Sequence, residues 1–303
     1  MHLSQEARDF GFCRLELGDA CDPLRLARTV AQNVPVVFRN ALLPCAALQL
    51  WDRDYLCAAL GDAPVSVSQT PDGRADALVD GKFCLPETRE MSMSAFFKAC
   101  DTDVHAVYYI QSQNSNLHAE FAPLLPDLPR VPDIARHIFP THNQNPDATN
   151  IWIGGSRSVT SLHKDHYDNL YTVIRGKKTF SLYPPTDFAH LCERRCGVHQ
   201  YHRLGPDSAQ WELVDMCEST HWVSASISEI PVPPIVVSLE PGDILFLPSL
   251  WYHQVEQEDD TIAVNWWFDM AFDDARYAYF SFLRRHCLES DKDTPSHCLK
   301  SDE

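Results

Sequence analysis

Thr160-Ser-Leu-His163-Lys-Asp165-His-Tyr-Asp-Asn169 opens the most strand-rich part of the chain. Alternate side chains of a β-strand share one face, so a strand here would direct His163 and Asp165 to the same side. A lone histidine, His253, follows far downstream in Leu247-Pro-Ser-Leu-Trp-Tyr-His253-Gln-Val. These three side chains therefore form a candidate metal triad of two histidines and one carboxylate.

The donor set of His163, Asp165 and His253 favours a particular metal. Two imidazoles and one carboxylate can hold one face of an octahedron and leave three positions open, an arrangement that suits Fe(II). An oxygen-activating enzyme needs such an open coordination sphere. A His-x-Asp pair alone is common on protein surfaces, so the prediction depends on the strands around it.

Lys178 gives a second indication of a site. On a strand it shares a face with Phe180 and Leu182, where an ammonium is costly unless it reaches water or meets an anion. If this face is the interior that holds the metal, the anion is a cosubstrate carboxylate, and the hydroxyls of Thr160 and Tyr109 are further donors. The alternative is an ordinary lysine whose ammonium extends to solvent.

The fold class follows from many short strands separated by turns. A β-hairpin is expected from residues 169–175 and 178–183, because a two-residue turn with Gly176 first suits type II′ geometry. Such strands predict a mainly β protein with flanking helices, closed in jelly-roll fashion. The remaining strands are expected at residues 34–40, 64–69, 107–111, 150–153, 235–239, 244–247 and 262–268.

The flanking regions read as helices. Ser92 is the expected N-cap of a short helix that reaches Lys98, and residues 273–288 show helical spacing of apolar side chains. We expect one folding unit: an N-terminal α/β extension over 1–105, a β core over 106–270 and a C-terminal helix with a polar tail over 271–303. The apolar stripe of that helix suggests pairing of two copies.

Residues 188–234 fit this pattern least well. They contain Cys192, Cys196, His199 and His202, which raises the possibility of a zinc site. Structural zinc sites usually separate their two ligand pairs by a longer loop. A surface insertion between core strands is therefore the favoured interpretation.

Composition limits the function classes. The net charge of −17, from 25 basic and 42 acidic residues, argues against binding of nucleic acid or anionic lipid. No apolar run approaches the roughly 18 residues of a membrane span, and the N-terminus does not resemble a signal peptide. The 11 cysteines are odd in number and scattered, which indicates reduced thiols and a cytoplasmic location, with a nuclear one also open.

The chain resembles the JmjC oxygenases, which have a double-stranded β-helix core and depend on Fe(II), 2-oxoglutarate and O2. The resemblance runs from about residue 30 to 285 and is carried by Val-Thr-Ser-Leu-His-Lys-Asp-His-Tyr-Asp-Asn-Leu-Tyr (159–171), Gly-Asp-Ile-Leu-Phe-Leu-Pro-Ser-Leu-Trp-Tyr-His (242–253) and Ala-Val-Asn-Trp-Trp-Phe-Asp-Met (263–270), with support from 35–42 and 70–77.

The resemblance implies a role for each matched residue. It places the iron ligands at His163, Asp165 and His253 and the 2-oxoglutarate contacts at Lys178, Thr160 and Tyr109. It also places Asn169 and Asn265 as amides beside the cofactor and Trp267 in the pocket wall.

The implied activity is hydroxylation of a protein. The best-matching members suggest a lysyl side-chain carbon of developmentally regulated GTP-binding proteins as the target. Demethylation of N-methyl-lysine, proteolysis of methylated histone tails and a non-catalytic cupin-like binding module are the alternatives. For a lysyl substrate we expect Asp168 and Asp269 at the pocket mouth, where they would receive the ammonium.

Overall fold

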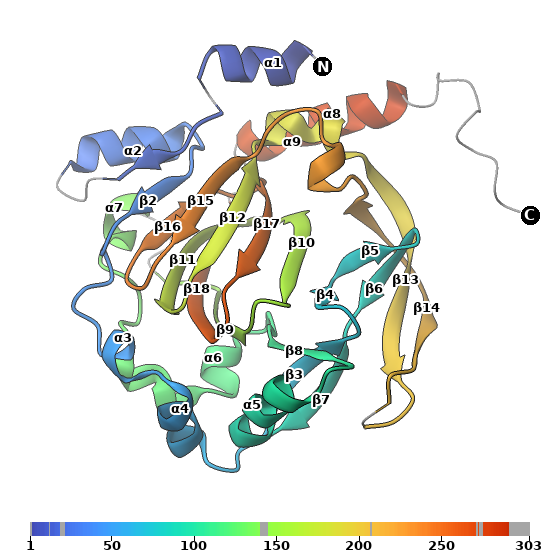
Figure 1. The fold of residues 1–303 in the computed structure, drawn as a ribbon. Coiled ribbons are helices and arrows are strands. Elements are labelled where there is room, and N and C mark those ends of the chain that lie inside the picture. Colours follow the sequence, from blue (N-terminus) through green and yellow to red (C-terminus); the bar gives the residue numbers. More distant parts are fainter. Residues whose placement is uncertain are drawn as a thin grey trace, which may run out of the picture.

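Two β-sheets face each other and form the body of the protein (Figure 1). The computed structural model describes residues 2–11, 13–18, 22–139, 145–206, 208–270, 272 and 275–290. The larger sheet has nine strands in the order β1 (Glu16–Leu17), β2 (Val36–Phe38), β16 (Ile244–Leu247), β11 (Tyr167–Arg175), β18 (Thr261–Asp269), β9 (Ala148–Gly154), β8 (Val107–Ile110), β3 (Val65–Thr70) and β7 (Glu87–Met91).

A five-stranded sheet lies opposite, in the order β15 (Ile235–Leu239), β12 (Lys178–Tyr183), β17 (Tyr252–Gln257), β10 (Val159–Lys164) and β4 (Arg74–Ala75). Apolar side chains from both sheets meet in one buried cluster, which includes Tyr171, Phe180, Leu245 and Val255. This cluster is the interior of the jelly roll. The predicted mainly β, cupin-like fold class is confirmed.

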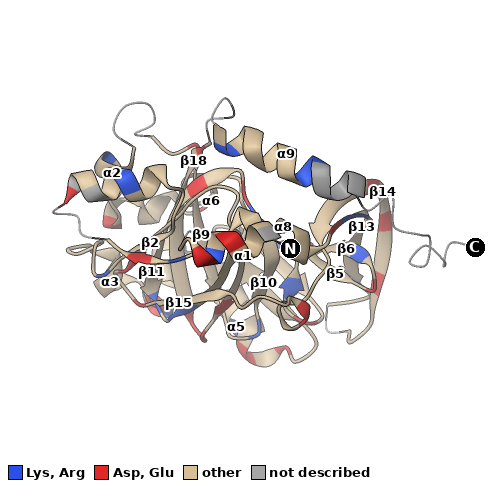
Figure 2. Ribbon diagram, turned by 90° about the horizontal axis from the view of Figure 1, so that it is seen from above, with Lys and Arg blue, Asp and Glu red and all other residues tan. Residues whose placement is uncertain are grey.

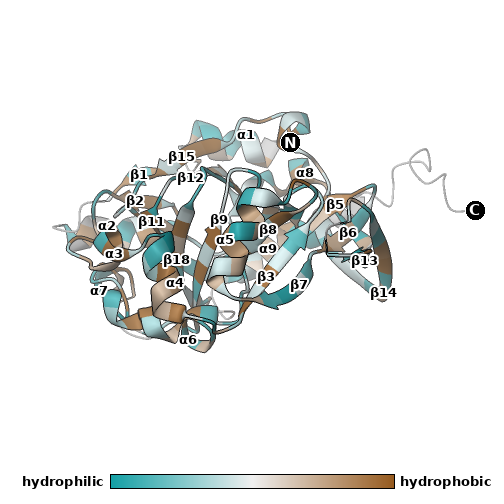
Figure 3. Cartoon of the chain, turned by 60° about the horizontal axis from the view of Figure 1, so that its bottom comes forward, coloured by the Kyte–Doolittle hydropathy of each residue, from teal (hydrophilic) through white to brown (hydrophobic). Residues whose placement is uncertain are grey.

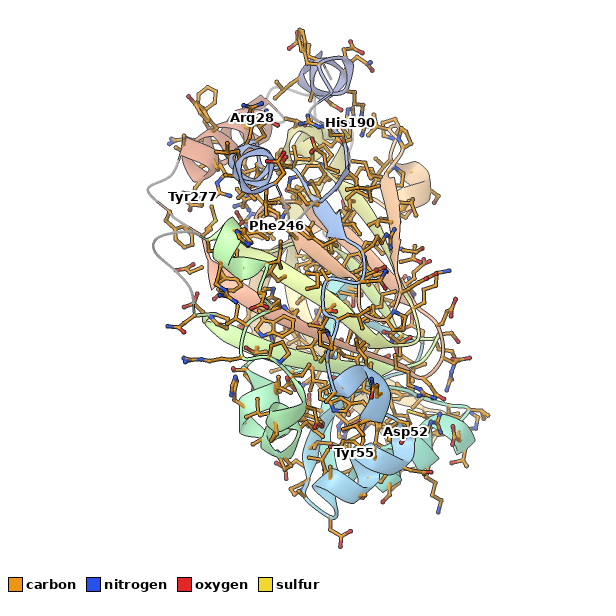
Figure 4. The ribbon with its side chains drawn as sticks, turned by 90° about the vertical axis from the view of Figure 1, so that its left-hand side faces the viewer. Arg28, Asp52, Tyr55, His190, Phe246 and Tyr277 are labelled. Atoms are coloured by element: carbon orange, nitrogen blue, oxygen red, sulfur yellow. The ribbon has the colours of Figure 1, made fainter. Side chains whose placement is uncertain are left out.

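Most helices lie on or around the outer face of the larger sheet. Trp266 and Phe246 of that sheet belong to the same buried cluster as helical residues such as Leu26 and Phe96. Figure 4 shows Phe246 near the upper helices, with Asp52 and Tyr55 at the α4 end of the molecule. The helices are α1 (His2–Asp9), α2 (Pro23–Ala31), α3 (Ala47–Leu50), α4 (Arg53–Leu60), α5 (Met93–Thr102), α6 (Asn116–Ala119), α7 (Ala135–Ile138), α8 (Phe188–Leu191) and α9 (Ala275–Ser290), with 3-10 turns at Ala122–Asp127, Pro185–Asp187 and Ile227–Glu229.

The expected hairpin between 169–175 and 178–183 is wrong in its pairing. Both strands exist, but β11 pairs with β16 and β18 whereas β12 pairs with β15 and β17. Gly176 has φ +74°, and a Cβ there would lie 2.4 Å from Thr261 Oγ1. The glycine turn therefore carries the chain from one sheet to the other, which is how the jelly roll closes.

The N-terminal region shares a sheet with the core. β2 pairs antiparallel with β16, and β3 pairs with β8, so strands from both sides of residue 105 lie in one sheet. The edge strand β7 reads Glu-Thr-Arg-Glu-Met and is hydrophilic along most of its length (Figure 3). Charged side chains on an edge strand discourage pairing with another chain. The domain boundaries themselves stay a prediction.

The segment expected as an insertion forms a long antiparallel hairpin of β13 (Glu193–Arg203) and β14 (Trp211–Val223). β13 also pairs in parallel with β6 (Lys82–Leu85), and β6 pairs with β5 (Ala77–Val79), which completes a four-stranded sheet. The helix α9 lies beside this hairpin (Figure 2). Acidic and basic segments are distributed around the ribbon in the same view.

Several local predictions are confirmed. The Ser92 side chain caps α5 by accepting a hydrogen bond from the Ala95 amide, although the helix continues beyond Lys98 to Thr102. Each described cysteine is a free thiol. No helix in the described ranges is long and apolar enough to span a bilayer. The polar tail expected at the C-terminus, from residue 291 onward, lies outside the described residues.

Candidate metal centre

The two histidines of the predicted triad are neighbours across the five-stranded sheet. His163 of β10 and His253 of β17 are directly paired in the antiparallel ladder, and their ring centroids are 4.2 Å apart. Alternation places both rings on the interior face of the sheet. Pairing of the two strands therefore places the two imidazoles side by side, although the residues lie far apart in the sequence.

Asp165 joins them from just beyond the strand. The expectation of one strand over residues 160–169 is wrong here, because β10 ends at Lys164 and Asp165 lies in the turn before β11. The Asp165 carbonyl accepts a hydrogen bond of 2.8 Å from the Leu250 amide, which fixes this turn against the loop before β17. The carboxylate oxygens lie 3.7 Å from Nε2 of His163 and 3.7 Å from Nε2 of His253.

The donor set is arranged as a divalent metal requires. One nitrogen of each histidine and one Asp165 oxygen all lie within 4.8 Å of one another. Metal–ligand distances near 2.1 Å would put adjacent ligand atoms roughly 3 Å apart. The three side chains therefore need to move only slightly closer together to bind one ion. Among the described residues this is the one cluster of its kind.

Backbone carbonyls select the tautomer of each ring. Nδ1 of His163 lies 2.7 Å from the Ser161 carbonyl, and Nδ1 of His253 lies 3.0 Å from the Trp251 carbonyl. A carbonyl only accepts, so each Nδ1 carries the proton and each Nε2 presents a lone pair toward Asp165. Burial, together with the neighbouring His163, lowers the pKa of His253 to about 4, which keeps it neutral and available as a ligand.

Lys178 lies in the same cavity as the triad. Its side chain is only 1% exposed, and its Nζ donates a hydrogen bond of 2.9 Å to the Tyr109 hydroxyl. Within the described parts of the chain it has no carboxylate partner, and burial alone lowers its pKa to about 7. Burial raises the pKa of Tyr109, and a hydrogen bond from Thr160 lowers it by a smaller amount. A buried cation without a counter-charge fits an anionic ligand.

The predicted amides occupy two layers. Asn169 lines the cavity, whereas Asn265 lies behind it and donates a hydrogen bond of 3.1 Å to Asn169 Oδ1. The Asn265 oxygen accepts from Trp152 Nε1 at 2.8 Å and from Asn150 at 3.3 Å. The second amide therefore holds the first in place and does not itself face the cavity.

Trp267 also lines the cavity, as predicted. Its ring stacks on Tyr167 with centroids 5.1 Å apart, and its buried Nε1 has no hydrogen-bond partner among the described residues. An orphaned indole N–H in the wall is a further donor for a bound ligand. Cavity residues that the sequence reasoning missed are Gln113, Trp152, Tyr171 and Val255. The alternations Asn169-x-Tyr171 and His253-x-Val255 could have found two of them, but Trp152 depends on strand pairing and Gln113 on a loop.

Asp168 does not have its predicted role at the mouth. It is 6% exposed, accepts a hydrogen bond of 2.7 Å from the Ser249 amide and lies 3.4 Å from Arg276 Nη1. Alternation explains this placement, since its neighbour Asn169 takes the interior face. Asp269 is exposed at the end of β18, on the same strand face as Trp267 but outside the cavity lining.

The zinc alternative finds no support in the hairpin. Cys192 is exposed, while the Cys196 thiol is buried and donates to the Thr220 carbonyl. The metal-type cluster found in the described ranges contains none of the four candidate residues.

Comparisons with known proteins agree with this geometry. The model of the cupin-like domain family matches residues 23–274. A human protein named bifunctional peptidase and (3S)-lysyl hydroxylase JMJD7 is 36% identical over 276 residues, covering 86% of this chain and 85% of its own. The chain belongs to the cupin-like JmjC oxygenase family. Such oxygenases use Fe(II) and 2-oxoglutarate.

Two further relatives extend across nearly all of this JmjC chain. JmjC domain-containing protein E of Dictyostelium discoideum is 34% identical, covering 93% of this chain and 91% of its own. Lysine-specific demethylase JMJ32 of Arabidopsis thaliana is 33% identical, covering 93% and 88%. The human and Arabidopsis relatives are named for different activities, so family membership alone does not decide the reaction.

Proposed function

We propose that this chain is an Fe(II)- and 2-oxoglutarate-dependent protein hydroxylase that oxidises a carbon of a lysyl side chain. The observation that carries the proposal is the pairing of two features in one cavity. His163, Asp165 and His253 converge at one end, and at the other end the buried ammonium of Lys178 has no anionic partner among the residues that the structure describes. A dicarboxylate that chelates a metal at one end fits both.

Each residue then has a part in binding. Nε2 of His163, Nε2 of His253 and the Asp165 carboxylate hold the iron. Lys178, Tyr109 and Thr160 bind the far carboxylate of 2-oxoglutarate, while Asn169 and Trp267 border the space between. When bound, the metal and its cosubstrate supply the oxidising chemistry, and the surrounding aromatic walls exclude water.

Demethylation of N-methyl-lysine is the nearest alternative, because it needs the same metal and cosubstrate. The Arabidopsis relative is named for that reaction and the human one for lysyl hydroxylation. Both chemistries begin with oxidation of a carbon on a lysyl side chain. They are separated by the product and not by the site.

Proteolysis is less well supported. Among the described residues the cavity lining contains no serine or cysteine, its one carboxylate, Asp165, belongs to the triad, and Thr160 and Lys178 are assigned to the cosubstrate. A peptidase needs a nucleophile or a separate base to activate water. A non-catalytic binding module is also disfavoured, since such a module has no need of a complete triad together with a buried ammonium.

The proposed substrate is a lysyl residue of a protein, with developmentally regulated GTP-binding proteins as the expected class. The net charge of −17 favours encounter with a cationic segment. Asp269 remains the candidate to meet the lysyl ammonium. Pairing of two copies through α9 also remains a proposal, supported by the 71% exposure of Tyr279 on that helix.

Mass spectrometry separates these reactions directly. The full chain is incubated with Fe(II), 2-oxoglutarate, ascorbate and matched peptides that carry lysine or N-methyl-lysine. We expect the lysyl peptide to gain one oxygen atom, only when 2-oxoglutarate is present. Loss of a methyl group from the second peptide, without oxidation of the first, would establish the demethylase instead. Cleaved peptides would point to proteolysis.

A further inference from the structure

Glu193 is a buried carboxylate at the root of the β13–β14 hairpin. Its side chain is 2% exposed, and its Oε1 accepts hydrogen bonds from Lys164 Nζ and, at 2.7 Å, from the Tyr252 hydroxyl. Its other oxygen, Oε2, lies 3.2 Å from Arg284 Nε of α9. One carboxylate therefore joins the hairpin, the five-stranded sheet and the last helix.

Its two partners in the sheet are the immediate neighbours of the candidate metal ligands. Lys164 follows His163, and Tyr252 precedes His253. Lys164 and Tyr252 are paired in the ladder directly beside the His163–His253 pair. Because side chains alternate, they point to the outer face while the imidazoles point inward. Glu193 thus bridges the two ligand strands from behind the ligands.

The ladder is short at this point. β10 ends at Lys164 and β17 begins at Tyr252, so their pair is the last one. On the other side the register shifts between Thr160 and His163. The ligand pair therefore sits on a β10–β17 segment bounded by an irregularity and by a strand end, while β17 is also paired with β12 on its other side.

The same hairpin also touches His163 from its ring face. Trp222 of β14 stacks parallel to the imidazole, with centroids 5.9 Å apart and 1° between the planes. The next residue, Val223, is the ladder partner of Glu193. Phe83 of β6 packs on Trp222 at 4.5 Å. The root of the hairpin thus contacts the His163 ring through Trp222. It also contacts the opposite face of β10 through the hydrogen bond between Glu193 and Lys164.

We propose that Glu193 is a positioning residue of the metal centre: it ties β10 to β17 at the end of their ladder and so fixes the relative placement of His163 and His253. This inference rests on the proposed metal site. Metal ligands must converge within about 0.2 Å of ideal distances, so slack between the two strands weakens the affinity for the ion. The hairpin is then part of the metal centre.

The test measures Mn(II) affinity and apo-protein stability separately. Mn(II) alone is titrated into the full chain, and the free-ion electron paramagnetic resonance signal gives the dissociation constant. Urea unfolding of the metal-free protein gives stability. Glu193→Gln should weaken Mn(II) binding by roughly tenfold, the lower end for residues that orient ligands. It also leaves the Lys164 ammonium without its counter-charge, so stability should fall as well.

The double variant Glu193→Gln with Lys164→Met distinguishes positioning from stability. Replacing both charges should restore much of the stability, because the more deeply buried cation, Lys164, is gone and Arg284 is exposed enough to be solvated by water. Mn(II) affinity should stay weakened by roughly tenfold, since methionine at position 164 donates no hydrogen bond and the connection from β10 through Glu193 to β17 is still broken. Recovery of wild-type affinity together with stability would overturn the inference and leave Glu193 a purely stabilising residue.

Two more variants complete the design. Glu218→Gln lies on the exposed face of the same hairpin and should match the wild type in both measurements. Tyr252→Phe removes a single hydroxyl of the tie and should weaken Mn(II) binding by about two- to tenfold, the worth of one hydrogen bond, even if the Glu193 variants do not fold. Unchanged affinity in Tyr252→Phe would then contradict the inference. If the wild type fails to bind Mn(II), the proposed metal site fails, which is a separate result.

Discussion

The ammonium of Lys178 lies 2.9 Å from the hydroxyl of Tyr109 and has no carboxylate within the described chain to balance it. The ring centroids of Tyr109 and Tyr171 lie 5.3 Å and 5.7 Å from the Nζ, which allows cation–π contacts. A neutral hydroxyl and two rings offset only part of the desolvation of a buried charge. The ligand-free protein therefore keeps an anion-binding group buried in the cavity.

This arrangement predicts proton uptake when 2-oxoglutarate binds. Burial lowers the Lys178 pKa to about 7, so at pH 8 the side chain is mostly neutral, whereas a bound carboxylate favours the ammonium. Binding should take up roughly 0.9 proton at pH 8 and roughly 0.1 at pH 6. Calorimetry with Mn(II)-loaded protein, in buffers of different ionisation enthalpy, measures this number.

Lys177→Met is the matched control, since its side chain is half-buried and lies 3.8 Å from Glu258. Its proton uptake should equal that of the wild type. Uptake that does not change between pH 6 and pH 8 would mean that Lys178 is already charged before the cosubstrate arrives.

The charge of Asp269 is predicted to affect turnover of the lysyl peptide through encounter with its ammonium. Asp269→Asn should lower the turnover of a lysyl peptide at low salt, because a rim charge mainly speeds encounter. The difference from wild type should shrink as salt rises. Asp62→Asn, also exposed but placed after α4, should leave turnover unchanged. A norleucine peptide oxidised as readily as the lysyl one would refute recognition of the ammonium.

Asn265 is predicted to support the pocket through its amide contacts. Asn265→Ala removes the partners of Trp152 Nε1 and Asn169 Oδ1, two buried groups. Leaving such groups unpaired costs about 1–3 kcal/mol of unfolding free energy, which urea titration measures. The 2-oxoglutarate affinity should fall too, because Asn169 lines the cavity. Asn114→Ala, on the exposed surface, should change stability by less than about 0.5 kcal/mol.

Gly176 should be intolerant of a side chain. Gly176→Ala places a Cβ 2.4 Å from Thr261 Oγ1 on a backbone with φ +74°, so strain and a clash combine. We expect a loss of stability of about 1–3 kcal/mol by urea unfolding. Gly61→Ala has a similar positive φ of +57° with open space around it and should lose only about 1 kcal/mol. Equal losses in the two variants would exclude the clash.

The sequence predicts side-chain placement correctly where the placement depends on alternation along a single strand. Lys178, Phe180 and Leu182 share a buried face as alternation requires, and His163 and His253 were identified by residue type and context. Pairing between distant strands was not visible. The hairpin assigned to 169–183 followed local turn chemistry at Gly176, but closure of the jelly roll sends its two strands to different sheets.

The same limit explains the errors at the site. Asp168 was expected at the mouth because it lies near the ligands in sequence, yet its pairing turns it toward Ser249 and Arg276. Trp152 enters the cavity only because β9 pairs with β18. Glu193 lies in the segment that fitted the resemblance least, and only the folded hairpin brings it behind the two histidines.

The central claim is that one cavity holds a metal at one end and the far carboxylate of 2-oxoglutarate at the other. Calorimetric titration of Mn(II), followed by 2-oxoglutarate, into wild type, Asp165→Ala and Lys178→Met tests it most directly. We predict that Asp165→Ala loses both ligands while remaining folded. Lys178→Met should retain Mn(II) but bind 2-oxoglutarate orders of magnitude more weakly, because the buried partner of a charge is worth about 3–5 kcal/mol. Wild-type 2-oxoglutarate affinity in Lys178→Met, or wild-type Mn(II) affinity in Asp165→Ala, would contradict the account.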